Sequence, residues 1–189
     1  MPSCRFLILA ATLASLGCAR YYPELANRSL YTCCNLPFNR DGDASDANYE
    51  NIGGTTIPLG TRVTVVNDHR NVIDFRAAIP SQQVFTLVFR FGRAHMKAAD
   101  YFGLILVPDD PTPRLKSLDP SIAAAVREGR IMPGMTKAEV LLARGYPPFH
   151  HTAGVTADRW TYYESPMVVD VVDFVDGRVA TVTRGPAPR

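Results

Sequence analysis

Short runs in which apolar and polar residues alternate fill the first half of the chain. Residues 29–35 alternate in this way, and residues 57–67 and 71–77 carry β-branched residues on either side of a polar turn. Residues 83–91 place three phenylalanines and a leucine on one face. A period of two is typical of half-buried strands, so the pattern predicts a small β-barrel or sheet.

Residues 94–107 have a different spacing, with apolar residues at intervals close to those of a helix. We expect a helix here despite Gly103, and we expect its apolar surface to face a core, because the segment is too short and too mixed to span a membrane. Residues 37–48 are polar and acidic. Their Asp46 stands where a calcium loop needs glycine, so we expect a loop without a calcium site.

The second half begins with two helix signals. Asp119-Pro120 has the favoured order of an N-cap followed by a first helical residue. Thr136 and Glu139 are spaced as a capping box, in which each side chain accepts a hydrogen bond from the other residue's backbone N–H. Gly145 and the two prolines after it end this second helix, which is predicted over residues 137–144.

Three alternating strands complete the chain, over residues 158–164, 167–175 and 178–184. The last two are joined by Asp176-Gly177, a two-residue turn that hairpins favour. The second half therefore has the predicted order α-α-β-β-β. Between the halves, residues 108–118 carry prolines and acids that indicate a linker.

The composition limits the classes of protein to which this chain can belong. Of the 189 residues, 47% are hydrophobic and 20% are charged, and the net charge is +2. This composition supports a buried core. No stretch of basic residues interleaves with aromatic residues, so we expect no nucleic-acid partner.

The first residues have the pattern of a secretory signal peptide. Arg5 precedes an apolar run at residues 6–14 that is too short to span a membrane as a mature helix. Ser15-Leu-Gly-Cys18 follows, and it resembles the lipobox of bacterial lipoproteins, although leucine is usual where Ser15 stands. The resemblance implies acylation of Cys18 and attachment to a membrane through this N-terminal lipid. Ordinary cleavage that releases a soluble periplasmic protein is the alternative.

These features predict an α+β chain with an N-terminal SH3-like β-rich unit, which ends in a helix, and a C-terminal unit of two helices and three strands. The predicted boundaries are a lipoprotein signal peptide at 1–17, a tether at 18–28, the SH3-like unit at 29–107, the linker at 108–118, the C-terminal unit at 119–184 and a tail at 185–189.

Two adjacent cysteines, Cys33 and Cys34, remain in the mature chain beyond residue 18. Neighbouring cysteines bridge only through a strained eight-membered ring, although an oxidising compartment favours disulfides. The alternation around them favours a strand with one cysteine pointing inward and the other outward.

Catalytic and metal-binding signals are weak. His150 and His151 are the only adjacent histidines, and a metal site there needs a third ligand such as Asp158. A serine nucleophile in a G-x-S-x-G turn is absent, and Asp109-Asp110 lies in the predicted linker, where preorganisation for acid–base catalysis is poor. We therefore expect no enzyme activity, no metal and no cofactor.

Two segments form the candidate binding surface. Tyr146, Pro147, Pro148 and Phe149 place rigid apolar groups on a loop, and Tyr163 points outward from a strand whose neighbours Trp160 and Tyr162 are candidates for the core. Closure of the helix–sheet core by this loop is the alternative.

The second half also resembles a known family. Gly134-Met135-Thr136, the helix stop Gly145-Tyr146-Pro147, Trp160-Thr161-Tyr162 and the hairpin at 174–179 are similar to the motifs of the SmpA/OmlA family of BamE-like outer-membrane lipoproteins. The resemblance covers about residues 119–184 and implies two helices packed on a three-stranded antiparallel sheet.

The resemblance implies a noncatalytic protein at the periplasmic face of the outer membrane, with envelope proteins or lipids as partners. About ninety mature residues precede the family-like part, so the fold alone does not transfer the assembly role of small family members. A soluble periplasmic binding or inhibitor module with the same fold is the second hypothesis.

Overall fold

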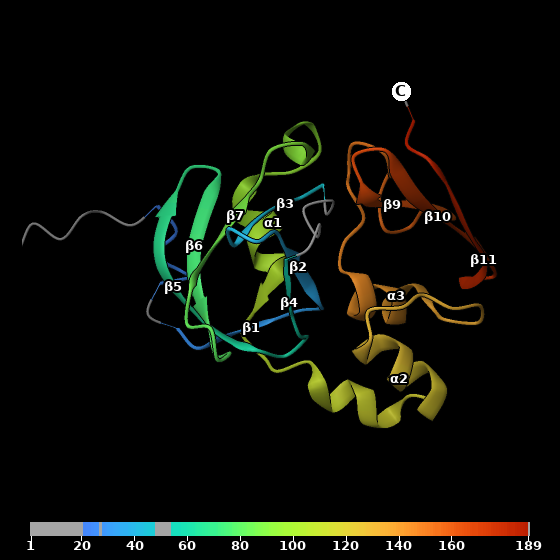
Figure 1. Ribbon diagram of the computed structural model, residues 1–189, viewed down its shortest axis with the longest axis horizontal. Helices are drawn as coiled ribbons and strands as arrows, with labels where there is room; N and C mark the ends of the chain where they lie inside the picture. Colours follow the sequence, from blue (N-terminus) through green and yellow to red (C-terminus); the bar gives the residue numbers. More distant parts are fainter. Residues whose placement is uncertain (1–20, 27, 48–53, 189) are drawn as a thin grey trace, which may run out of the picture.

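The computed structural model describes residues 21–26, 28–47 and 54–188 (Figure 1). The fold is mixed α+β, with a curled sheet in the N-terminal part and two helices beside a second sheet in the C-terminal part. The predicted signal peptide and Cys18 lie outside the described residues.

Six strands form the sheet of the N-terminal part, in the order β3-β7-β6-β5-β1-β8. All neighbours are antiparallel except β3 and β7. The strands are β1 (Leu30–Thr32), β3 (Asp43–Ser45), β5 (Arg62–His69), β6 (Val72–Ala77), β7 (Val84–Val88) and β8 (Leu106–Val107). A separate antiparallel pair consists of β2 (Leu36–Phe38) and β4 (Thr55–Ile57).

Aromatic side chains fill the space between the six-stranded sheet and the β2–β4 pair. Phe38, Phe75 and Phe85 are fully buried, with ring centroids 4.9 to 6.0 Å apart. The alternation predicted for this part is confirmed, because every second residue is buried in β6, in β7 and in β5 up to the irregularity after Val65.

The helix predicted over residues 94–107 is shorter than expected. A 3-10 turn η1 (Gly92–Ala94) precedes α1 (Ala98–Ile105), and residues after Ile105 form β8, which pairs with β1. α1 buries Tyr101 and Phe102 against the sheet, so its apolar side belongs to the core as predicted.

The strand predicted over residues 29–35 is wrong in its length, whereas the sequence left the oxidation state of its two cysteines open. β1 ends at Thr32, residues 33–34 bend, and β2 then starts at Leu36. A disulfide joins Cys33 and Cys34, with Cys34 fully buried and Cys33 partly buried. The Cys33 N–H donates to the carbonyl of Ile105, which extends the pairing of this segment with β8 beyond Thr32.

The acidic segment 37–48 is also more ordered than a loop. It contains β3, whose parallel pairing with β7 joins residues more than forty positions apart in sequence. The buried Asp46 ends this segment by accepting backbone hydrogen bonds from Arg90, Phe91 and Gly92. Its carboxylate thus binds backbone amides.

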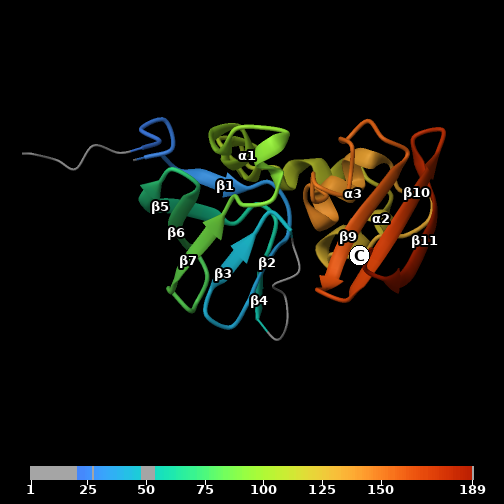
Figure 2. The same ribbon diagram turned by 90° about the horizontal axis from the view of Figure 1, so that it is seen from above.

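The C-terminal part has the predicted element order. Helices α2 (Pro120–Arg127) and α3 (Lys137–Arg144) lie on one face of an antiparallel sheet (Figure 2) with the order β11-β10-β9. The strands are β9 (Arg159–Ser165), β10 (Val168–Val175) and β11 (Arg178–Pro186). Trp160 and Tyr162 are fully buried under the helices, as predicted for the core.

The two parts exchange side chains across their boundary. Leu59, from the N-terminal part, and Leu115, from the 3-10 segment η2 (Thr112–Ser117) in the predicted linker, are buried in the C-terminal core. In the opposite direction, Phe149 is buried in the N-terminal core. The predicted linker is therefore packed at Leu115. In the part of the chain that the structure describes, no helix is long and apolar enough to cross a membrane.

Candidate functional site

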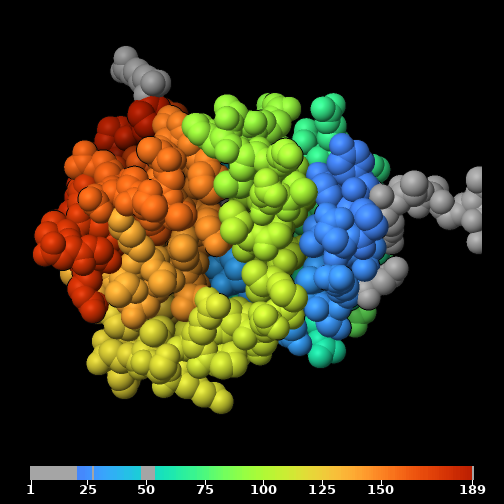
Figure 3. Space-filling view, turned by 180° about the vertical axis from the view of Figure 1, so that it is seen from behind, coloured from blue at the N-terminus to red at the C-terminus, as the bar shows by residue number. Residues whose placement is uncertain are grey.

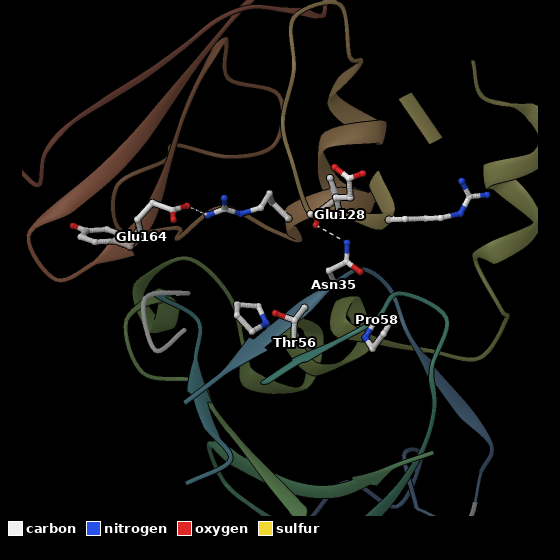
Figure 4. A pocket seen from close by; sticks show the side chains of 11 residues that line it. Asn35, Thr56, Pro58, Glu128 and Glu164 are labelled. Atoms are coloured by element: carbon white, nitrogen blue, oxygen red, sulfur yellow. Dashed lines mark hydrogen bonds and ion pairs between the residues drawn. The ribbon is translucent and has the colours of Figure 1, made fainter. Parts of the chain in front are cut away.

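A cleft of about 290 Å³ lies between the two parts of the chain. Figure 4 shows Thr56 and Pro58 on one side, Glu128 and Glu164 on the other, and Asn35 between them. The C-terminal ends of α2 and α3 and the end of β9 provide the second wall. The remaining lining residues are Pro37, Arg127, Gly129, Ala143, Arg144 and Tyr163.

Asn35 forms the floor of the cleft and bonds to both parts. Its side-chain amide donates to the carbonyl of Val126 at 2.6 Å and to that of Ala143 at 3.0 Å. Its side-chain oxygen accepts from the N–H of Leu59 at 3.0 Å. The Asn35 side chain is buried, and its bonds reach carbonyls at the C-terminal ends of both helices; the carbonyl of Val126 also accepts from the N–H of Gly129 at 3.1 Å.

Two glycines let the helix ends approach this asparagine. Gly129 and Gly145 follow α2 and α3 with positive φ, a conformation that allows each helix to stop sharply. A Cβ atom at Gly145 would lie 3.0 Å from Sγ of Cys34, so the absence of a side chain permits close contact with the cysteine pair. The glycine that the sequence identifies as a helix stop thus also brings α3 against the N-terminal part.

Paired charges form one end of the cleft. Arg144 lies 2.6 Å from a carboxylate oxygen of Glu164 and 3.9 Å from one of Asp170. The guanidinium of Arg184 donates to both carboxylate oxygens of Asp170, from Nε at 2.8 Å and from Nη2 at 2.9 Å. Its Nη2 also lies 3.5 Å from a carboxylate oxygen of Glu164. We name these four side chains the Arg144 cluster. They also line a second hollow, of about 420 Å³, between α3 and β11.

The surroundings of Asp170 keep its carboxylate ionised. Burial raises the pKa of this carboxyl, but the hydrogen bonds and charge of Arg184, together with Glu164 and Arg144, outweigh burial and hold that pKa below its usual value. The same contact raises the pKa of Arg184. The guanidinium of Arg144 also lies 5.5 Å from the ring centre of Tyr162, whose hydroxyl donates to the carbonyl of Gly145. Burial raises the pKa of Tyr162, so this hydroxyl stays protonated as a donor.

The predicted binding residues lie beside the cleft and are mostly covered. Pro147, Pro148, Phe149 and Tyr163 are buried, and Tyr146 is partly buried against the N-terminal core. Phe149 and Tyr146 pack in the N-terminal core, so the alternative interpretation, in which this loop closes the helix–sheet core, is wrong. Tyr163 alone among these residues also lines the cleft.

Stacked aromatic rings also join the N-terminal part to the C-terminal part. Phe91 stacks on His150 with centroids 5.0 Å apart, and His150 stacks on Tyr163 at 6.1 Å. Burial lowers the pKa of His150, His151 and His95 lower it further, and Asp46 partly opposes them. Neutral imidazole is therefore the favoured form of His150 at this contact.

Sequence reasoning missed Asn35, Arg144 and Glu164. The strongest available signal for Asn35 is its position between Cys34 and Leu36, where a polar residue within an apolar stretch indicates a buried group with specific partners. Arg144 and Glu164 come together only when α3 packs on β9, and no local pattern predicts that contact.

Cys18 lies outside the described residues, so lipid attachment stays a prediction. Among the residues that the structure describes, no group of three or more His, Cys, Asp or Glu side chains is placed to hold a metal ion.

No protein-family model matches the chain, and no curated protein or solved structure is significantly similar to it. The resemblance to the SmpA/OmlA family therefore stays a prediction from the sequence.

Proposed function

We propose that this chain is a noncatalytic lipoprotein of the cell envelope, attached to the outer membrane through Cys18, with its periplasmic body acting as an interaction module. In this proposal the N-terminal part is SH3-like and the C-terminal part is BamE-like, as in the SmpA/OmlA family. The order of two helices and three antiparallel strands supports the second assignment.

The cleft at Asn35 carries the proposal that the body binds a partner. Asn35 bonds to both parts, so the walls of the cleft are held at a fixed separation. Thr56 and Pro58 are exposed on one wall, and Glu128 is exposed on the other. Polar and charged side chains outnumber the apolar Pro37, Pro58 and Ala143 in the lining, so the cleft is suited to a short polar segment of a partner protein.

The chemistry of the cleft favours binding over catalysis. The carboxylates of Glu164 and Asp170 are paired with arginines, and the pKa of Asp170 is held low. A carboxylate stabilised as the anion is a weak general base and a poor general acid near neutral pH. These groups are therefore suited to fixing the geometry of the wall.

The runner-up proposal is a soluble periplasmic binding or inhibitor module. It uses the same cleft and differs only in the fate of residue 18. The two proposals are separated by the N-terminal peptide of the mature protein.

Cell fractionation and mass spectrometry test the anchor. We expect the protein in the membrane fraction, with an N-terminal peptide that begins at Cys18 and carries the mass of its acyl chains, because two chains give stable attachment. Cys18→Ser should abolish that mass. Recovery of wild-type protein in the soluble periplasm, with an unmodified N-terminus after residue 18, favours the runner-up.

Photo-crosslinking in intact cells tests the cleft. A photoreactive residue at Thr56, on its rim, should give a discrete adduct with an envelope protein. The matched control is Thr64, an exposed threonine on β5 away from the cleft. Identical adducts from both positions contradict a role for the cleft.

A further inference from the structure

A third hollow, of about 580 Å³, lies where the described chain begins. It is bounded by Tyr21 and Tyr22, by the turn after β5 and by the start of α1. Figure 3 shows residues 21–26, in blue, beside α1, in green, on one face of the molecule. We name this surface the Tyr21 face.

Three cations line the Tyr21 face: Arg70, Arg93 and Lys97. All three are exposed, and none forms a salt bridge with a residue that the structure describes. Among the described residues, no acidic side chain lines the hollow. The nearby carboxylate of Asp68 accepts the backbone N–H of Tyr22.

The aromatic residues of this face have separate roles. Tyr22 is buried, donates its hydroxyl to the carbonyl of Arg70 and packs edge-on against Phe102 with centroids 5.4 Å apart. The chain is therefore fixed to the fold at Tyr22. Tyr21 is 55% exposed, and an exposed tyrosine is well suited to the boundary between water and lipid, where its ring meets apolar groups and its hydroxyl meets water.

The length of the chain limits how far this face can lie from a lipid attached at Cys18. Three residues separate Cys18 from the fixed Tyr22, and an extended chain covers at most about 14 Å over these four residue-to-residue steps. This upper limit is less than twice the Debye length of roughly 8–10 Å at physiological salt, so the tether keeps the cations of this face near the range in which surface charges attract them.

We propose that the Tyr21 face is the membrane-contacting surface of this protein, with Arg70, Arg93 and Lys97 bound to anionic phospholipid headgroups; this inference rests on the proposed anchor at Cys18. The face fixes the orientation of the body on the bilayer. The Asn35 cleft shares no lining residue with the Tyr21 face, so it stays accessible to a partner.

Co-sedimentation with vesicles tests the face without the lipid. The sample is the chain starting at residue 19, which retains every described residue and cannot be acylated at Cys18. We expect it to bind vesicles of phosphatidylcholine mixed with phosphatidylglycerol, and to bind vesicles of phosphatidylcholine alone much more weakly.

The diagnostic variant is Arg70→Gln, Arg93→Gln and Lys97→Gln together. Each cation near an anionic surface contributes about fivefold to binding, so the triple variant should bind the anionic vesicles about 100-fold more weakly. The matched control is Arg62→Gln, Arg76→Gln and Lys116→Gln, which removes three exposed cations elsewhere and should keep most of the binding. Equal thermal melting midpoints establish that both variants are folded.

Three results overturn the proposal: equal binding by the triple variant and the wild type, equal loss in the matched control, or displacement by inorganic phosphate beyond that by chloride at the same ionic strength. The last result indicates a pocket for a small anion. The acyl mass of the protein from cells is measured separately. An acylated N-terminus without vesicle binding therefore refutes the Tyr21 face alone, and vesicle binding without acylation refutes the anchor alone.

Discussion

The Asn35 side chain joins the ends of two helices to the N-terminal part. Its amide group donates to carbonyls at the ends of α2 and α3, and its oxygen accepts from the N–H of Leu59, between β4 and β5. Leaving a buried donor or acceptor without a partner costs roughly 1–3 kcal/mol of folding free energy. A residue that bonds three such groups therefore contributes strongly to stability. Asn35 therefore stabilises the relative placement of the two parts.

Asn35→Ala should lower the free energy of unfolding by about 3 kcal/mol, because Val126, Ala143 and Leu59 lose their bonds to the amide and water recovers only part of the loss. Urea unfolding measures the change. Asn39→Ala is the matched control, since Asn39 bonds only the backbone of its own turn, and it should cost about 1 kcal/mol or less. Equal losses in the two variants argue against a special role for Asn35.

His150 should make stability depend on pH. Its pKa in the folded protein lies below the usual value of about 6.5, so the unfolded chain binds more protons in the intervening range. The stability contributed by neutral His150 is complete above pH ~6.5 and is lost as the pH falls through the folded pKa.

Urea midpoints measured between pH 7.5 and 5 check this dependence, a range chosen to bracket the usual histidine pKa of about 6.5. His150→Gln should flatten the slope, whereas His69→Gln, on an exposed position of β5, should leave it unchanged. An unchanged slope in His150→Gln contradicts the assignment.

At the scale of elements, α3 depends on its ends. The Thr136 hydroxyl accepts from the N–H of Glu139, and the Glu139 carboxylate accepts from the N–H of Thr136 at 2.7 Å. The predicted capping box is therefore confirmed. α3 has eight residues, which is too short for independent stability, so its caps matter alongside packing of Val140 and Ala143.

Thr136→Ala should cost about 0.5–2 kcal/mol, because the N–H of Glu139 loses its acceptor at the helix start. Thermal or urea unfolding provides the measurement. Glu139→Gln is the control, since glutamine retains an acceptor for the Thr136 N–H, and it should cost less. A midpoint unchanged in Thr136→Ala shows that other contacts satisfy this end of the helix.

Elements with local signals were predictable from the sequence. The N-cap at Asp119, the capping box, the Asp176-Gly177 turn and the three final strands all depend on residues within a few positions of one another. The β5–β6 hairpin was predicted for the same reason. Helix α3 is accordingly found over residues 137–144, as expected.

Features that join distant segments were not predictable. β3 pairs with β7 across about forty residues, and its short acidic sequence has no strand pattern of its own. The cleft has the same origin, because Asn35 contacts residues 91 and 108 positions away. Tyr146 to Phe149 were identified as apolar and rigid, but only the packed structure shows that the N-terminal part covers them.

At the scale of the whole molecule, the two cores are interlocked. Leu59 and Leu115 lie in the C-terminal core, Phe149 lies in the N-terminal core, and Phe91 stacks on His150 between them. An exchange of buried side chains makes the stability of each core depend on the other. We therefore expect the two parts to unfold in one cooperative transition.

Trp160 provides the test, because the sole tryptophan of the chain is fully buried in the C-terminal core. Phe85→Ala removes a fully buried ring from the N-terminal core and should cost about 3–5 kcal/mol. If the cores are coupled, Phe85→Ala lowers the unfolding midpoint measured by Trp160 fluorescence. The midpoint measured by hydrogen exchange of β6 amides falls with it. Val175→Ala, at a position that is 62% exposed, should move neither midpoint appreciably. A Trp160 midpoint that stays at the wild-type value in Phe85→Ala contradicts the coupling, since it requires the C-terminal core to remain folded after the N-terminal part has lost Phe149 and the bonds of Asn35.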